Sequence, residues 1–415
     1  MRRLYQGYIL KTVNSITNYI LLLVWIVIML SLYTGNGVTP VIVILFFLSA
    51  LYSLYRKSKL SINLNFLFIY IFLAYYLLLT VIFTQDLLVM TSKFILFPIF
   101  VYYIIPKNIN GVIRILSIFK SFIGFTAIFG LYEYMQHFNL MVNFVKIDAV
   151  KWIQTMNLNS VYYPSSIFLH YTYFAYVLLL AFILVIVIPY KNRVLNLVYK
   201  TLIAISIFLP QSRIVWIAFG VILILSFILN RQGILTYRKL SVIVLILIIV
   251  VSLCLYFDVF AFISNYISLR FSSLYRYGLA DGSLGQRIGT LRNWENYLDS
   301  DTIKAIIGSG FGGVNSYLST YSFFNGYTTA DSTVTSFLID TGVIGLFIFL
   351  LSMFQILVIV VKGKGIFREL ALYTIVASSI VSLTIDFWAN YVILHIFYVV
   401  IICAFIGMRL TKQEK

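Results

Sequence analysis

The chain reads LRFSSLYRYGLADGSLGQRIGTLRNWENYL at residues 269–298, IIGSGFGG at residues 306–313 and TTADSTVTSFLIDTGVIGL at residues 328–346. These pieces belong to a long polar segment that runs from Asp258 to Asp340 and interrupts a sequence otherwise made of apolar runs. Arginines, acids, glycines and aromatic residues gather in this segment. The apolar runs around it therefore decide the fold, and the segment itself is the first place to look for a site.

Hydrophobic residues make up 62% of the 415 residues, charged residues make up 10%, and the mean hydropathy is +1.00. No soluble domain buries enough surface to hide so many apolar side chains, so lipid must be the solvent for much of the chain. The net charge of +17 would suggest a nucleic-acid partner for a soluble protein, but here the charges lie in short blocks between apolar runs. Such blocks are typical topology signals, and we expect no nucleic-acid partner.

A helix that spans a membrane needs about 20 mostly apolar residues. The sequence contains about twelve runs of this kind: Tyr19–Tyr33, Val38–Tyr55, Phe66–Phe83, Thr91–Ile105, Ile115–Met135, Tyr171–Ile188, Leu197–Leu209, Ile214–Leu229, Leu240–Phe257, Val343–Val361, Leu370–Ile385 and Tyr391–Met408. The run at Leu197–Leu209 is short, ends at Pro210 and carries the weakest signal. We therefore predict an all-α integral membrane protein of about twelve transmembrane helices.

The distribution of charge predicts the orientation. With both termini in the cytoplasm, the inner segments hold 21 of the 30 basic residues and two of the 13 acids. The outward segments then hold the other nine basic residues and eleven acids. Because basic residues concentrate on the cytoplasmic side of membrane proteins, this bias predicts cytoplasmic N and C termini.

Two outward connections are long, and the other connections are short. The predicted organisation is N-terminal transmembrane helices at 1–133, a first outward loop at 134–170, central transmembrane helices at 171–257, a large outward loop at 258–340, and C-terminal transmembrane helices with a short cytoplasmic tail at 341–415. The two halves are not obviously repeated, which argues against an inverted-repeat transporter.

Arg213, in PQSRIVW, lies between two apolar runs at the outward end of a predicted helix pair. Its guanidinium is a permanently charged planar fork suited to phosphate oxygens. The alternative is an anchor that snorkels into lipid headgroups, but such basic anchors favour the inner face. We predict that Arg213 contacts an anionic substrate, since ionisable groups at membrane depth are candidates for function.

In the large outward loop, Arg287 and Arg292 lie near Trp294 and Tyr297 in GQRIGTLRNWENYL. Aromatic faces stack on the apolar faces of sugar rings while arginines clamp phosphate, so these residues could line one amphipathic helix that faces a substrate. The alternative is a surface helix that lies on lipid headgroups. Two further arginines are weaker candidates, at the approach to the site: Arg270 and Arg276.

The segment Gly308–Gly313, GSGFGG, literally matches the pattern G-x-G-x-x-G. A dinucleotide site with that pattern requires a βαβ unit, whereas this segment is flanked by membrane helices and faces outward. Glycines let the backbone turn tightly and approach a ligand or another helix closely. We predict a tight turn that returns the loop toward the membrane.

Carboxylates at outward helix ends are the candidate bases. Asp331 opens ADSTVTSF, where it could N-cap the following helix, and Asp340 lies close to the next apolar run. A carboxylate in such a pocket could accept the proton of an attacking sugar hydroxyl, so these two are the first candidates for catalysis. Glu133 and Asp386 are the competing bases at other outward helix ends.

No metal site or cofactor is expected. The histidines His137, His170 and His395 pair with no carboxylate or cysteine at metal-ligand spacing, and Cys254 and Cys403 both fall inside apolar runs. His170 precedes a helix at the end of the first outward loop, where it could contact substrate or lie at the membrane interface. Hydrolase, P-loop and zinc-protease motifs are absent.

In their order along the chain, these features resemble the O-antigen polymerase and O-antigen ligase superfamily of bacterial envelope proteins. The matching features are Ser212 and Arg213 at an outward helix end, a late outward loop with Arg287 and Trp294, then IIGSGFGG, then DS…DTGVIGLFIFL. The stretch YYPSSIFLHYTYFAYVLLL also resembles the segment that leads into the family's middle helix. The likeness covers roughly residues 133–350.

The resemblance implies a metal-independent membrane glycosyltransferase that uses undecaprenyl-diphosphate-linked sugars. It would lie in the bacterial cytoplasmic (inner) membrane, with its site facing the periplasm or exterior. Arg213 and Arg287 would hold the diphosphate, and Asp331 or Asp340 would orient or deprotonate the acceptor hydroxyl. The remaining arginines, aromatics, Glu133 and His170 would contact the diphosphate or the sugars.

Within this superfamily, the ligase branch typically places a histidine before a GliGl-like segment, which corresponds to GVIGL at residues 342–346 of this chain. This chain has Asp331 there and no histidine between Asp258 and Asp340, which favours a repeat-unit polymerase for O-antigen or capsule. The alternatives are an O-antigen ligase that joins polymer to lipid A core and a polysaccharide flippase or other secondary transporter. A chain-length regulator and a flippase are the expected protein partners.

Overall fold

The computed structural model describes residues 66–83, 87–139, 141–142, 162–168, 170–229, 289–321, 330–387 and 391–413. Three predicted helices, at Tyr19–Tyr33, Val38–Tyr55 and Leu240–Phe257, lie outside these residues, as do Arg270, Arg276 and Arg287. Within them, every regular element is a helix. The longer helices are α3 (Leu67–Phe83), α6 (Ile109–Gln136), α8 (Tyr171–Val187), α9 (Arg193–Phe208), α10 (Arg213–Leu229), α17 (Thr333–Val361), α18 (Ile366–Ser382) and α19 (Tyr391–Gln413).

The remaining elements are shorter. Three of them follow one another without a break and make one apolar helix from Leu87 to Ile104: α4 (Leu87–Thr91), the π-helical turn η2 (Ser92–Leu96) and α5 (Phe97–Ile104). The others are the 3₁₀ turn η4 (Ser166–Phe168) and the helices α14 (Trp294–Ser300), α15 (Thr302–Ile307) and α16 (Gly313–Tyr321).

The described part of the chain contains four helices long and apolar enough to cross a membrane: Leu87–Ile104, Ile109–Gln136, Thr333–Val361 and Val392–Gln413. Three shorter apolar helices accompany them, namely α3, α8 and α10. Together with the composition, these helices establish a multi-pass helical membrane protein, as predicted. The total of about twelve helices and the cytoplasmic position of both termini stay predictions.

Every predicted apolar run that falls within the described residues coincides with a helix, including the weak run at Leu197–Leu209. The main difference is α17, which begins at Thr333 rather than at Val343. Most residues from Thr333 to Asp340 are buried in protein, so their polar side chains meet protein groups and not lipid. The predicted boundary of the large outward loop at residue 340 therefore falls inside a helix.

Side-chain caps explain where several helices begin. The Asn108 side chain accepts the N–H of Gly111 at 2.7 Å at the start of α6. At the start of α9, the Asn192 side chain accepts the N–H groups of Val194 and Leu195. Asparagine is among the best N-cap residues because its side-chain oxygen satisfies N–H groups that the first helical turn leaves without a partner.

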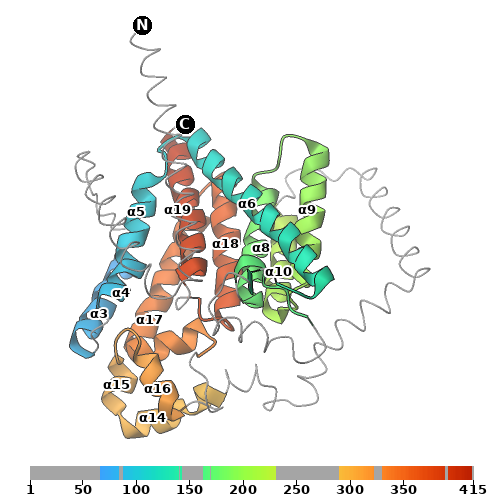
Figure 1. The fold of residues 1–415 in the computed structure, drawn as a ribbon. Coiled ribbons are helices and arrows are strands. Elements are labelled where there is room, and N and C mark those ends of the chain that lie inside the picture. Colours follow the sequence, from blue (N-terminus) through green and yellow to red (C-terminus); the bar gives the residue numbers. More distant parts are fainter. Residues whose placement is uncertain are drawn as a thin grey trace.

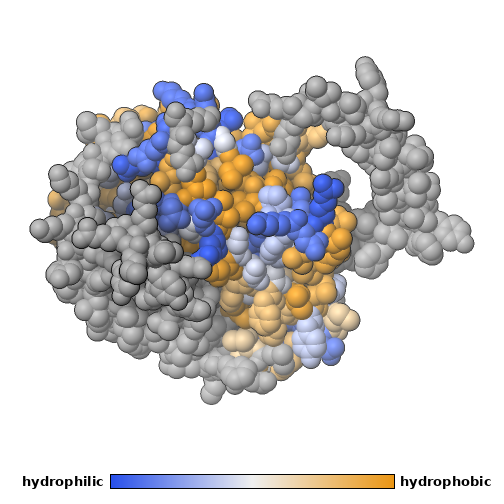
Figure 2. Space-filling model, turned by 90° about the horizontal axis from the view of Figure 1, so that it is seen from above, coloured by the Kyte–Doolittle hydropathy of each residue, from blue (hydrophilic) through white to orange (hydrophobic). Residues whose placement is uncertain are grey.

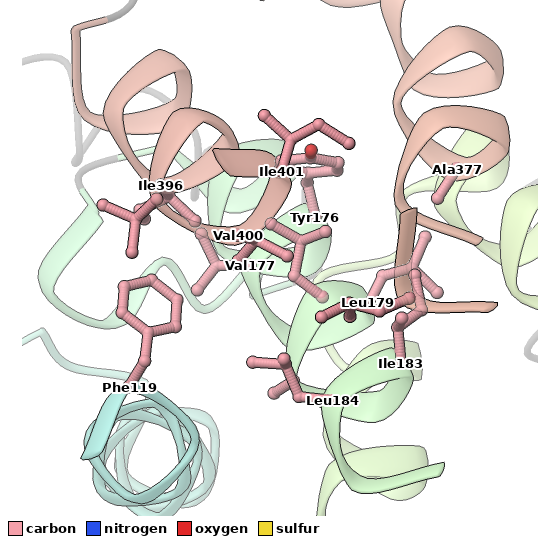
Figure 3. Close-up of a cluster of buried hydrophobic side chains, with 14 of the residues drawn as sticks. Phe119, Tyr176, Val177, Leu179, Ile183, Leu184, Ala377, Ile396, Val400 and Ile401 are labelled. Atoms are coloured by element: carbon pink, nitrogen blue, oxygen red, sulfur yellow. The ribbon is translucent and has the colours of Figure 1, made fainter. Parts of the chain in front are cut away.

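Helix α8 lies at the centre of the bundle. It packs against α6, α9, α10, α18 and α19, and nearly every residue from Phe174 to Val185 is buried. A helix that is apolar on all sides is typical of such a central position. Side chains of the surrounding helices pack against α8 residues such as Tyr176 (Figure 3): Phe119 from α6, Ala377 from α18, and Ile396 and Val400 from α19.

The bundle has two distinct ends. The short helices α14, α15 and α16 lie together at the end where α17 begins, opposite the end of α19 (Figure 1). We call these the loop end and the C-terminal end. The connection between α8 and α9 lies at the C-terminal end (Figure 1), so α9 runs toward the loop end and α10 starts there.

Exposed basic residues gather at the C-terminal end, in the helix connections and in the last turns of α19: Lys107, Lys191, Arg193, Lys362, Lys364, Arg409 and Lys412. Seen from this end, hydrophilic side chains are spread over the surface among apolar ones (Figure 2). Basic residues at this end are what the predicted cytoplasmic side would carry, and the orientation itself stays a prediction.

Candidate functional site

The glycine segment Gly308–Gly313 forms a tight loop between α15 and α16 at the loop end. Gly308 and Gly310 have φ of +103° and +81°, values that residues with a Cβ rarely adopt. A Cβ at Gly308 would lie 2.5 Å from the carbonyl oxygen of Asp340, and one at Gly310 would lie 2.8 Å from the carbonyl oxygen of Leu79. The predicted tight turn is confirmed, and glycine is required there because the loop touches both α17 and α3.

Asp340, on α17, lies against this loop and is only 5% exposed. Its carboxylate accepts three hydrogen bonds, from the Tyr76 hydroxyl at 2.7 Å, the Val314 N–H at 2.9 Å and the Gly312 N–H at 3.2 Å. Its carbonyl oxygen accepts the N–H of Gly310 at 2.8 Å. Asp340 therefore joins α3, the glycine loop and α17.

The first turn of α17 packs against the connection between α18 and α19. The Thr333 hydroxyl donates to the carbonyl oxygen of Ile385 and accepts the N–H of Phe387, each at 2.9 Å. The N-cap is Ser332, whose backbone is extended and whose hydroxyl oxygen accepts an N–H one turn along. The predicted capping role of Asp331 is therefore wrong, because Asp331 lies one residue before the cap, with a left-handed φ of +50°.

Asp386 lies in that same connection and is 7% exposed. Its carboxylate accepts the hydroxyl of Ser336 at 2.5 Å. Asp386 also lies close enough to Asp340 and Tyr76 to act on both electrostatically. The two buried aspartates thus belong to one polar cluster, whereas Asp331 at its edge is only half-buried.

Arg213 is the first residue of α10, at the loop end, and is half-buried. Gln211 and Ser212 before it are buried, and Gln211 has a left-handed φ of +53°. The positive charge of Arg213 therefore lies at the N-terminus of α10, which is itself the positive end of the helix dipole. Helix α10 packs against α18, which ends at Ser382, just before Asp386.

Lys93 is a buried cation that the sequence reasoning did not single out. It lies in the π-helical turn η2 and is 5% exposed. Its ammonium group lies 5.2 Å from the centre of the Phe311 ring, which belongs to the glycine loop. The sequence signal that could have found it is a lysine inside an apolar run. The structure adds that single π-helical turns tend to occur at functional sites.

Glu133 is enclosed by hydrogen-bond donors at the end of α6 and is 1% exposed. Its carboxylate accepts the Asn139 amide at 3.0 Å, the Tyr162 hydroxyl at 2.8 Å, and the N–H groups of Ser165 and Ser166 at 3.1 and 2.6 Å. Burial and then the negative charge of Glu133 raise the pKa of Tyr162, so this phenol stays a proton donor at neutral pH. Glu133 thus ties the end of the first outward loop to α6.

His170 is the N-cap of α8. Its Nδ1 accepts the N–H of Thr172 at 3.1 Å and also contacts the Thr172 hydroxyl. The ring stacks against Tyr171, with the ring centres 4.8 Å apart. These contacts make His170 part of the start of α8, and its predicted contact with substrate stays a prediction. In the described ranges, no group of His, Cys, Asp and Glu could hold a metal ion.

Helices α14, α15 and α16 form a small subdomain with its own core. Tyr297 is 8% exposed, and its ring packs 5.2 Å from that of Tyr317. Burial raises the pKa of both phenols, and the Tyr317 hydroxyl donates to the carbonyl oxygen of Thr290 at 2.7 Å. The predicted sugar-stacking role therefore gains no support at Tyr297. Trp294 is half-buried against the same core, and Arg292 is exposed.

Of the predicted site residues, Arg213 begins α10 at the loop end, Asp331 lies just before α17, and Asp340 lies in the first part of α17. The Asp386 carboxylate accepts the hydroxyl of Ser336 on that same helix. Glu133 and His170 lie at the same end but belong to the packing of α6 and α8. The arginines Arg270, Arg276 and Arg287 are not among the described residues, so their predicted roles remain predictions.

Comparison with known proteins points to the same part of the chain. Residues 198–350 match a family model described as O-Antigen ligase. The match runs from α9 through the glycine loop to the middle of α17, and so includes Arg213, Asp331 and Asp340. A search of curated proteins finds no match. Residues 198–350 are therefore similar to the O-antigen ligase family model, which confirms the resemblance of the chain to the O-antigen polymerase and ligase superfamily.

Proposed function

We propose that this protein is a repeat-unit polymerase of O-antigen or capsular polysaccharide. It transfers the growing glycan from undecaprenyl diphosphate to the non-reducing sugar of an incoming lipid-linked repeat unit, at the outer face of the cytoplasmic membrane. The observation that carries the proposal is the O-Antigen ligase match over residues 198–350, which includes the arginine at the start of α10 and the polar cluster at the start of α17.

The reaction breaks the bond between the anomeric carbon and the diphosphate oxygen and forms a bond from the acceptor hydroxyl oxygen to that carbon. Lipid diphosphate leaves as an anion, and the hydroxyl proton passes to a base. Catalysis therefore needs positive charge at the leaving group and an acceptor for one proton. Arg213, half-buried at a helix N-terminus, suits the first task because a guanidinium can hold two phosphate oxygens at once. Arg287 is proposed as its partner.

Burial distinguishes the candidate bases. Both carboxylate oxygens of Glu133 and of Asp340 already accept hydrogen bonds inside the protein, and both residues are almost fully buried. Asp386 is buried as well. Asp331 is half-buried, and its left-handed backbone is of the kind that collects at active sites. We therefore favour Asp331 as the residue that orients or deprotonates the acceptor hydroxyl.

A ligase that joins finished polymer to lipid A core is the second candidate, because the matching family model carries the description O-Antigen ligase. Polymerase is favoured because this chain has Asp331, and no histidine, between Asp258 and Asp340. The two differ in which acceptor they use and not in the leaving group, so Arg213 would have the same task in both.

A deletion strain separates these candidates. Loss of a polymerase leaves single repeat units on the lipid core, whereas loss of a ligase leaves no glycan on the core. Purified protein that lengthens lipid-linked repeat units in detergent would establish the enzyme directly. If purified protein lengthens nothing under conditions in which it stays folded and monodisperse, the polymerase proposal fails, and the deletion strain then decides between a ligase and a transport role.

A further inference from the structure

In the glycine loop, the backbone N–H groups that could bind an anion already donate to a carboxylate of the protein, that of Asp340. Backbone N–H groups at a glycine-rich turn leading into a helix make a favourable site for a negative charge. Here the N–H groups of Gly312 and Val314, at the start of α16, both point at the carboxylate of Asp340. The loop that resembles a phosphate cradle in sequence thus holds an internal carboxylate.

The same carboxylate is fixed from the opposite side by α3. The Tyr76 hydroxyl donates to it at 2.7 Å, and Tyr76 is 1% exposed. One residue before Tyr76, the Tyr75 hydroxyl donates to the carbonyl oxygen of Ile307 at 2.5 Å. Farther along α3, the Thr80 hydroxyl accepts the N–H of Phe311 at 3.2 Å. Helix α3 therefore contacts the end of α15, Asp340 of α17 and the glycine loop at three successive positions along its length.

Helix α17 approaches the loop equally closely. The Ser309 N–H and hydroxyl both donate to the carbonyl oxygen of Ile339, at 3.2 and 2.9 Å. A Cβ at Gly342 would lie 2.3 Å from the carbonyl oxygen of Ile306. The Asp340 side chain thus joins α17 to α3 through Tyr76, and to the start of α16 in the subdomain through Gly312 and Val314.

We infer that Asp340 is a positioning residue, whose carboxylate anchors the subdomain of α14, α15 and α16 on the loop end of the bundle and does not take the acceptor proton. A general base needs a lone pair directed at its substrate, within hydrogen-bond reach. Both oxygens of Asp340 instead face donors of the protein, and burial keeps the group from solvent. The inference rests on the proposed function only for its kinetic readout, because anchoring can be measured without any substrate.

The first test is hydrogen–deuterium exchange on the purified full chain. Variants Asp340→Asn and Tyr76→Phe each remove part of the anchor, and Asp331→Asn serves as the control at the edge of the cluster. Because hydrogen bonds to a charged group are among the stronger ones, Asp340→Asn should speed exchange at Gly312 and Val314 by at least about tenfold. Tyr76→Phe should change the same amides in the same direction, and Asp331→Asn should leave them as in the wild type. Unchanged exchange in Asp340→Asn overturns the anchor.

The second test is the pH dependence of repeat-unit lengthening. A positioning role predicts that Asp340→Asn lowers turnover but keeps the shape of the wild-type pH profile, because a residue that takes no proton in the reaction contributes no step to that profile. Loss of all turnover in Asp340→Asn, with wild-type protection of Gly312 and Val314, would make Asp340 a chemical participant and overturn the inference. If the wild type itself lengthens nothing, the proposed function fails while the exchange experiment still decides whether Asp340 is the anchor.

Discussion

Substituting Gly342 by alanine should disrupt the contact between α17 and the glycine loop. Gly342 interrupts α17 with φ +66° and ψ −176°, a conformation that is almost exclusive to glycine. An alanine Cβ there would lie 2.3 Å from the carbonyl oxygen of Ile306 and 2.5 Å from the nitrogen of Gly308. Both neighbours are backbone atoms, so neither can swing aside as the tip of a long side chain could.

The size of the effect follows from two contributions. Holding alanine in this backbone conformation costs about 1–3 kcal/mol, and forcing extra volume into a packed contact costs about 1–3 kcal/mol more. We therefore expect Gly342→Ala to lower stability by about 2–6 kcal/mol. The matched control is Gly220→Ala on α10, because a Cβ at Gly220 meets nothing within 4 Å. In a helix interior, alanine is favoured over glycine by about 0.5–1 kcal/mol, so the control should be neutral or slightly stabilising.

The assay is thermal denaturation of the purified variants in one detergent. At each temperature, the fraction of protein that stays monodisperse is measured. Gly342→Ala should melt several degrees below the wild type, or fail to yield folded protein while Gly220→Ala yields it normally. A melting temperature for Gly342→Ala at or above that of Gly220→Ala would refute the geometry of the kink and its contact with the glycine loop.

Two further predictions concern the polar contacts. Glu133→Ala removes the acceptor of four donors and should lower the stability of the protein by about 3–5 kcal/mol. Tyr162→Phe removes one donor and should lower it by about 1–3 kcal/mol, so equal melting temperatures for the two variants would contradict the enclosure of Glu133. Hydrogen bonds from Lys304 lower the pKa of Asp301, so the cap at the start of α15 is fully present above the ordinary pKa of aspartate and is lost as pH falls through the lowered value. Protection of the Lys304 amide, measured relative to its intrinsic exchange rate at each pH, should therefore fall on acidification in the wild type and not in Asp301→Asn. An identical pH dependence of protection in both proteins would rule this out.

The sequence was a good guide to the helices. Runs such as Tyr171–Ile188 and Ile214–Leu229 are apolar along their whole length, and lipid or a central position in a bundle are the environments that accept them. It was a poorer guide to the start of α17, because Thr333–Asp340 contains polar residues that a hydropathy pattern assigns to a loop. Those residues are helical because their hydroxyl and carboxyl groups find partners in α3, in the glycine loop and in the connection after α18.

The roles of single carboxylates could not be read from the sequence. Asp331 and Asp340 are nine residues apart and look equivalent as candidate bases, yet one is half-buried and the other accepts three hydrogen bonds from distant parts of the chain. The donors to Asp340 include Tyr76, which precedes it by 264 residues. Tyr297 likewise looked like a ligand-stacking residue, and only the packing against Tyr317 reveals it as a core residue.

The central claim is that Arg213, at the loop end of the bundle, binds the diphosphate of a lipid-linked substrate. The most direct measurement is the rate at which purified protein lengthens lipid-linked repeat units, compared between the wild type, Arg213→Lys and Arg193→Lys. Arg193 is exposed at the C-terminal end, so its replacement should leave the rate unchanged. Because a lysine cannot reproduce a bidentate contact to the leaving group, Arg213→Lys should slow lengthening by about 10²–10³-fold at normal yield of folded protein. Polymer of full length made at the wild-type rate by Arg213→Lys would contradict the account.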